Sequence, residues 1–98
     1  MLIVKNSIMI LIKPKLQKAF RIHKRVVPKV GYSLMYPEGI ISINETSYEI
    51  LYHCNGTNTI DDIKSNLLTK YNPMDINEIF NDIDHFLQIA YTNKWITD

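Results

Sequence analysis

A change of hydrophobic period within residues 36–56 sets narrow limits on the fold of this chain. Ile41 and Ile43 alternate with Ser42, which is typical of a half-buried strand, whereas the apolar residues after position 44 recur at helical spacing. Asn44 stands at the junction, where its side-chain oxygen can accept the free N–H groups of a helix's first turn. The segment therefore predicts a short strand that leads directly into a capped helix, and it contains no catalytic group.

Two further strands are expected before this corner. Residues 19–23 alternate apolar and polar side chains, residues 30–36 do so less regularly, and Pro28 separates the two segments. Together with the strand at residues 39–43, they predict three strands in the first half of the chain.

A second and a third helix are expected after residue 56. Thr59 and Asp62 match a capping box with Asp in the place of Glu or Gln, and Asn72-Pro73 ends the helix that follows. The apolar face of this second helix comprises Ile60, Ile63, Leu67 and Tyr71.

The third helix begins at Asp75, with Glu78 placed to bond back to the cap. Its apolar stripe is wider than a helix on a single core needs, so we expect it to pack on two sides. The stripe comprises Ile76, Ile79, Phe80, Ile83, Phe86, Leu87, Ile89 and Ala90. Trp95 and Ile96 then indicate a short terminal strand or a lid on the core. Three strands followed by three helices predict an α+β, winged-helix-like domain.

Length and composition predict one small cytoplasmic domain. The chain has 98 residues, and no apolar run reaches the length of a bilayer span. The apolar N-terminal segment is interrupted by Lys5 and Asn6 and lacks a signal-peptide cleavage site. A single cysteine fits a reducing compartment. We expect residues 1–13 to form an apolar extension, as an extra strand or a dimerisation segment, and residues 14–98 to form the domain.

The charges are distributed unevenly along the chain. Residues 1–36 carry eight Lys or Arg and no carboxylate, whereas residues 37–98 carry ten carboxylates and three Lys. Two interpretations stay open, because the halves could neutralise each other inside one domain or form two faces with different partners.

The side chains that could carry chemistry are scattered, and they predict a protein without enzymatic activity, metal or cofactor. His23, His53 and His85 are far apart in the sequence, and only His53 has a second potential ligand beside it. That neighbour, Cys54, lies on an apolar face, which predicts a buried and inert thiol. The three glycines form no phosphate-binding loop.

Several motifs in combination resemble a known family. They are Pro37-Glu38-Gly39, Ile43-Asn44-Glu45-Thr46, Ile50-Leu51 and Cys54-Asn55-Gly56-Thr57, followed by Ile60, Ile63, Leu67, Tyr71, Ile83, Phe86 and Leu87. This pattern, from about Pro14 to Ile96, is similar to the PqqD-like peptide chaperones of pyrroloquinoline quinone biosynthesis. It thereby resembles the wider class of recognition elements for ribosomally synthesised, modified peptides (RiPPs). The chain departs from the family at Asn55, where Asp is usual, and in its first dozen residues.

The resemblance implies a non-catalytic adaptor. Such domains bind the leader of a precursor peptide as an added strand on the third strand, against the third helix, and present it to a maturation enzyme, often a radical S-adenosylmethionine (SAM) enzyme. An edge strand with unpaired backbone groups suits this mode. The predicted peptide-binding residues are Gly39, Ile40, Ile41 and Ser42 on the strand and Ile79, Asp82, Ile83 and Phe86 on the helix. For Ile41, Ile83 and Phe86 a place in the core is the alternative, and for Asp82 the alternative is a solvated surface. The basic residues Arg21, Lys24, Arg25 and Lys29 are a further candidate surface, which could dock a partner enzyme or an acidic leader.

Two other functions are compatible with parts of this sequence. A winged-helix DNA-binding protein would share the fold, but the second helix has only Lys64, Asn66 and Lys70 to offer, and the third helix is acidic. We therefore expect no nucleic acid partner and, without a spanning segment, no membrane partner. Residues 2–4 and 8–12 could pair between two copies of the chain, so a homodimer is possible in addition to peptide binding.

Overall fold

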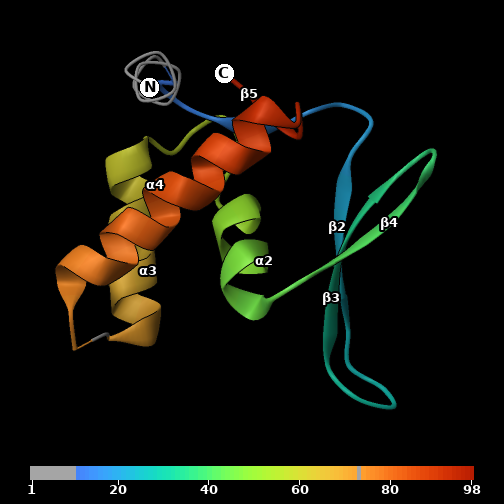
Figure 1. Ribbon diagram of the computed structural model, residues 1–98, viewed down its shortest axis with the longest axis horizontal. Coiled ribbons are helices and arrows are strands. Elements are labelled where there is room, and N and C mark those ends of the chain that lie inside the picture. Colours follow the sequence, from blue (N-terminus) through green and yellow to red (C-terminus); the bar gives the residue numbers. More distant parts are fainter. Residues whose placement is uncertain (1–10, 73) are drawn as a thin grey trace.

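The computed structural model describes residues 11–72 and 74–98. Most of these residues form a three-stranded antiparallel sheet and the three helices that cover one of its faces (Figure 1). The elements in chain order are β1 (Lys15–Leu16), β2 (Arg21–Arg25), β3 (Gly31–Tyr36), β4 (Gly39–Ile43), α2 (Glu45–Tyr52), α3 (Ile60–Tyr71), α4 (Ile76–Thr92) and β5 (Ile96–Thr97). The predicted order of strands and helices is therefore confirmed. Pairing segments are expected at residues 2–4 and 8–12, and of these residues 2–4 and 8–10 lie outside the described part of the chain.

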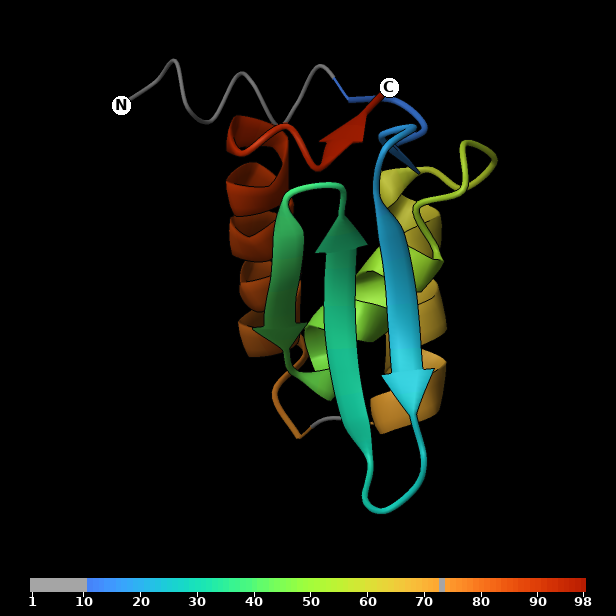
Figure 2. The ribbon, with the colours of Figure 1, turned by 90° about the vertical axis from the view of Figure 1, so that its right-hand side faces the viewer.

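The main sheet has the strand order β2-β3-β4, so that β2 and β4 are its two edges (Figure 2). Strand β4 starts at its predicted residue, and a two-residue loop, Pro37-Glu38, connects it to β3. Strand β2 starts two residues later than the alternation predicts. The reason is a turn before it, in which the N–H of Phe20 donates to the carbonyl of Gln17 at 3.0 Å.

Side chains at the starts of α2 and α3 act as the sequence predicts, and those at the start of α4 do so in part. Asn44 accepts a hydrogen bond from the N–H of Ser47 at 2.8 Å, and Thr59 forms a complete capping box with Asp62. These bonds satisfy N–H groups that have no partner inside the helix. At α4, Asp75 accepts from the N–H of Glu78 at 3.2 Å. The expected return bond from the Glu78 carboxylate is absent, so this cap is half of a capping box.

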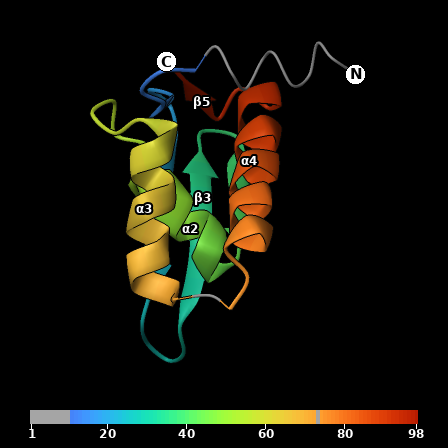
Figure 3. The same ribbon diagram turned by 90° about the vertical axis from the view of Figure 1, so that its left-hand side faces the viewer.

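Helix α2 lies between the sheet and the outer pair of helices, α3 and α4 (Figures 1 and 3). Each of these elements contributes fully buried side chains to one core, and the largest are Leu34, Ile50, Leu51, Ile63, Leu67, Ile83, Leu87 and Ile96. None of the described helices has the length and apolar character needed to cross a membrane.

A second, two-stranded sheet of β1 and β5 joins the two ends of the described chain. Ile96 in β5 is buried, which confirms the terminal strand expected from the sequence. Leu11 is also buried, and the Asp98 carboxylate accepts hydrogen bonds from the N–H groups of Ile12 and Lys13 at 2.9 and 2.7 Å. Residues 11–13 are therefore attached to the folded unit, and the domain boundary at Pro14 stays a prediction.

Candidate functional site

Strand β4 has a free edge, because β3 is its only neighbour among the described strands. Its register pairs Tyr36 with Gly39, Leu34 with Ile41 and Met35 with Ile40. A two-residue hairpin loop closes on a hydrogen-bonded pair, and bonded and non-bonded pairs then alternate along the ladder.

This alternation divides the four predicted β4 residues into two groups. On the pattern set by the hairpin, Gly39 and Ile41 exchange hydrogen bonds with β3. The N–H and C=O groups of Ile40 and Ser42 consequently point away from β3, toward the free edge. Only these two residues can pair with an added strand.

The side chains of β4 alternate between the two faces of the sheet. Ile41 and Ile43 pack against the core. Ile40 is 64 % exposed on the opposite face, which no described helix covers, and its cross-strand neighbour Met35 is 37 % exposed. An added strand would therefore meet apolar side chains on both faces of the sheet.

Helix α4 lies on the β4 side of the molecule, and α3 lies on the β2 side (Figure 2). Of the four helix residues predicted for the site, Asp82 is exposed, whereas Ile79 and Phe86 are half-buried and pack on the edge of the core. The Phe86 ring also lies 6.3 Å from the Trp95 ring, which restricts its position.

Ile83 is the exception among the predicted wall residues. It is 0 % exposed and belongs to the core cluster, so it cannot touch a ligand on the surface. The physical reason is its position on the helix, one turn before Leu87, on the line that faces the centre of the core. Ile83 supports the wall from beneath, and the accessible wall residues are Ile79, Asp82 and Phe86.

A cleft of about 340 Å³ lies at the start of α4 and is lined by Thr46, Tyr71, Met74, Asp75, Glu78, Ile79 and Asp82. Two of the predicted site residues, Ile79 and Asp82, are thus brought together with two further carboxylates. The acidic lining suits a basic group.

Tyr71 is one of the five cleft residues outside the predicted site; the other four are Thr46, Met74, Asp75 and Glu78. Its hydroxyl oxygen is buried without a hydrogen-bond partner. Burial first, and then the carboxylates of Glu45 and Glu49, raise the pKa of Tyr71 to about 12, so the hydroxyl stays protonated. In the sequence, Tyr71 is the last residue on the apolar face of the second predicted helix. That position predicts a core residue and gives no sign of a binding site.

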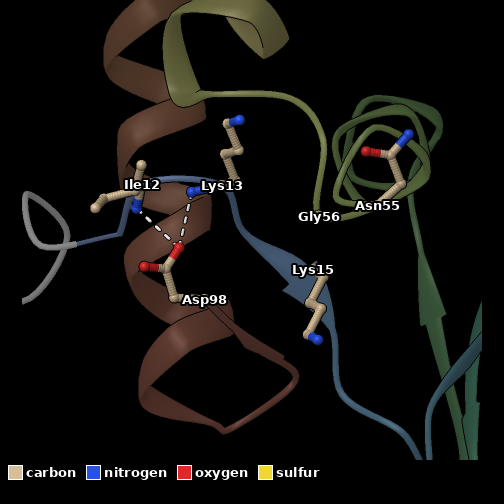
Figure 4. A pocket seen from close by; sticks show the side chains of 6 residues that line it. All are labelled: Ile12, Lys13, Lys15, Asn55, Gly56 and Asp98. Carbon is tan, nitrogen blue, oxygen red and sulfur yellow. Dashed lines mark hydrogen bonds between the residues drawn. The ribbon is translucent and has the colours of Figure 1, made fainter.

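Another cleft, of about 480 Å³, lies beside β1 and is lined by Ile12, Lys13, Lys15, Asn55, Gly56 and Asp98 (Figure 4). The side chains of Lys13 and Lys15 point in opposite directions, and the Asp98 carboxylate is occupied by two backbone N–H groups. The lining therefore has no convergent set of polar groups.

The groups that could carry other chemistry are not arranged as a site. Burial raises the pKa of the Cys54 thiol to about 12, which matches the predicted inert thiol. Within residues 11–72 and 74–98, no three His, Cys, Asp or Glu side chains gather in a way that could hold a metal ion. Lys64, one of the few cations on α3, forms an ion pair with Asp84 at 3.0 Å.

Known proteins match the part of the chain that carries this edge. The family model for "Coenzyme PQQ synthesis protein D (PqqD)" matches residues 31–96. A "PqqA binding protein" of Methylococcus capsulatus is 37 % identical over 67 residues, which are 68 % of this chain and 69 % of that protein. Its counterpart in Acinetobacter baumannii strain AYE is 35 % identical over 66 residues, which are 67 % of this chain and 68 % of that protein.

A solved structure is similar in fold. It is the solution NMR structure of the PqqD truncation of Methylobacterium extorquens PqqCD, described as a functional, stand-alone RiPP recognition element. The TM-score is 0.69 at 22 % identity, and the match covers 87 % of this chain and 88 % of that one. The predicted α+β fold is thus confirmed, and the matched residues 31–96 include every residue of the predicted site. The chain belongs to the PqqD family.

Proposed function

We propose that this chain is a non-catalytic adaptor that binds the leader of a ribosomally synthesised precursor peptide and presents it to a maturation enzyme of the radical SAM class. The observation that carries this proposal is the free edge of β4, where Ile40 and Ser42 direct their backbone groups away from β3. The family match supports it, because relatives at 35–37 % identity are named PqqA binding proteins.

The leader adds a strand to the sheet beside β4. Its backbone pairs with Ile40 and Ser42, which gives affinity with little demand on sequence. Gly39 and Ile41 hold β4 on β3 and thereby keep the edge straight. Alternate leader side chains point toward the helices, where Ile79 and Phe86 form an apolar wall, and this wall selects among sequences.

The acidic cleft at the start of α4 gives the leader a second point of recognition. A Lys or Arg of the leader fits between Asp82 and Glu78, and its charge-assisted hydrogen bonds are stronger than neutral ones. We therefore expect a basic residue in the leader, next to the part that pairs with β4.

The chemistry belongs to the partner enzyme in this proposal. The adaptor contributes by ordering an otherwise flexible peptide, so that the enzyme meets it in one conformation.

An NMR titration of the ¹⁵N-labelled chain tests the proposal. The ligands are the precursor peptide encoded beside this chain, a scrambled version of its leader, and duplex DNA. We expect the native peptide alone to shift the amide signals of Gly39–Ile43 and of residues 79–86. The absence of peptide-induced shifts, or equal shifts with the scrambled peptide, refutes the proposal, and shifts with DNA alone assign the fold to nucleic acid binding.

A further inference from the structure

The sheet has a second free edge, on β2, that peptide binding at β4 does not use. Four of the five residues of β2 are exposed, and these four are Arg21, His23, Lys24 and Arg25. Cations on an edge strand commonly prevent sheets from joining, and that role alone would explain the charges. Two further features on this side of the molecule are not explained by protection of the edge.

The first feature is the loop between β2 and β3, whose apolar side chains are exposed. Val26, Val27 and Val30 are 61, 77 and 55 % exposed. The loop is also braced, because the Arg25 guanidinium donates to the carbonyl of Lys29 at 3.3 Å. A protective edge gains nothing from exposed valines, whereas a docking surface gains an apolar centre between charges.

The second feature is a row of rings that runs from the inner side of the sheet to the end of α2. The Lys24 ammonium lies 5.9 Å from the Tyr32 ring centre, and the Tyr32 and Tyr48 rings are 5.1 Å apart. Tyr48 stacks on Tyr52 at 6.4 Å, and Tyr52 meets the His53 ring at 5.3 Å. Tyr52, on the helix that packs beside β2, is 61 % exposed. We call Arg21–Val30 together with Tyr52 and His53 the β2 surface.

The charge of the β2 surface is not neutralised within the described chain. No carboxylate precedes Glu38 in the sequence, so β2 and its loop contain none. The two ion pairs found among the described residues join Lys64 to Asp84 and Lys70 to Glu49, and neither involves a residue of the β2 surface. A partner that covers the β2 surface must therefore bring negative charge, arranged around an apolar patch that receives the valines.

We propose that the β2 surface docks onto an acidic, apolar-centred surface of the maturation enzyme. This inference rests on the proposed function, because it names where the adaptor holds the enzyme. The geometry favours it, since β2 and β4 are opposite edges of the sheet and one chain can hold the enzyme and the leader at the same time. Exposed tyrosine and arginine side chains are also enriched in protein interfaces.

Charge reversal tests the inference, with the full chain and the radical SAM enzyme encoded beside it. The test variant is Arg21→Glu/Lys24→Glu, and the matched control is Lys13→Glu/Lys94→Glu, which makes the same change in net charge away from β2. Calorimetry measures the affinity of each variant for the enzyme and, separately, for the precursor peptide. A second test variant, Val27→Ser, keeps the charges and removes the apolar centre.

We expect the test variant to bind the enzyme at least about tenfold more weakly than the control, with leader affinity unchanged. Val27→Ser should weaken enzyme binding as well, and rising salt should weaken it in the wild-type protein. If the two double variants bind the enzyme with equal affinity, the inference is overturned. If the wild-type protein does not bind the leader, the proposed function is overturned instead. If the wild-type protein is a dimer that the charge reversal dissociates, the β2 surface binds a second copy of the chain instead. If the wild-type protein binds single-stranded DNA and the charge reversal abolishes this binding, the β2 surface binds nucleic acid instead.

Discussion

Replacement of Ser42 by proline separates peptide binding from folding. The Ser42 N–H points toward the free edge of β4, so the substitution removes no hydrogen bond to β3. Its side chain is exposed, and proline is tolerated on an edge strand where the lost N–H faces solvent. The neighbouring replacement, Ile41→Pro, removes a bond to β3 and a side chain that packs against the core.

The expected magnitudes follow from these positions. A net hydrogen bond contributes about 0.5–1.5 kcal/mol, so the lost Ser42 N–H alone weakens leader binding by about two- to tenfold. The proline ring also occupies the place of the incoming strand, which brings the expected loss to about tenfold or more. The free energy of unfolding should change by less than about 1 kcal/mol for Ser42→Pro and fall by about 2–4 kcal/mol for Ile41→Pro.

Fluorescence anisotropy with a labelled leader measures the affinity, and urea unfolding measures the stability. Ser42→Ala is the control, because it keeps the N–H and should bind the leader as the wild-type protein does. A folded Ser42→Pro protein with wild-type leader affinity refutes strand addition at β4.

The other predictions concern the wall, the cleft, the core and the buried thiol. Phe86→Ala should lower leader affinity because it removes part of the wall; unchanged affinity with a lower melting temperature would make Phe86 a core residue only. Asp82→Asn should weaken binding of a leader with a basic residue and reduce the dependence of that binding on salt, whereas an unchanged salt dependence contradicts the acidic cleft as its site. Leu87→Ala should lower the free energy of unfolding by about 2–5 kcal/mol, measured in urea, since Leu87 is 0 % exposed; a loss below about 1 kcal/mol speaks against a tightly packed core. Burial raises the pKa of the Cys54 thiol from 9.0 to about 12, so the protonated form favours folding and stability should fall as pH rises from 9 toward 12. A Cys54→Ala protein with the same loss over this range would show that another group is responsible.

Local chemistry explains why so much of the fold could be predicted from the sequence. The strand-to-helix corner depends on Asn44, and the start of α3 depends on Thr59 and Asp62, all within a few residues of the bonds they form. Such signals need no knowledge of the tertiary structure. Strand β2 starts later than predicted because a turn at Gln17 precedes it. The alternation of apolar residues gives no sign of this turn.

The candidate site was less predictable because it depends on which side of a helix meets the core. Ile79, Ile83 and Phe86 share one apolar stripe in the sequence, and periodicity cannot rank them by depth. Only the packing of α4 shows that Ile83 is fully covered while the other two lie at its margin. Tyr71 joins the cleft for a related reason, since α3 and α4 meet there from distant parts of the sequence.

The unequal charges of the two halves of the chain acquire a structural meaning from the strand order. The basic first third supplies the β2 edge, whereas the strand at the other edge, β4, leads into the acidic second half, and β3 lies between the two. The alternative interpretation is mutual neutralisation inside the domain. The ion pairs found among the described residues join residues of the second half to each other, so none of them neutralises the basic edge at β2. One charge interaction between the halves lies away from β2, where hydrogen bonds with Thr59 and, after them, the charge of Lys13 lower the pKa of Asp62. The charge of the β2 edge is therefore available to a partner from outside. A cationic leader is attracted to the α4 cleft and repelled from β2, and an acidic partner surface experiences the reverse, so that charge alone directs the two ligands to different edges.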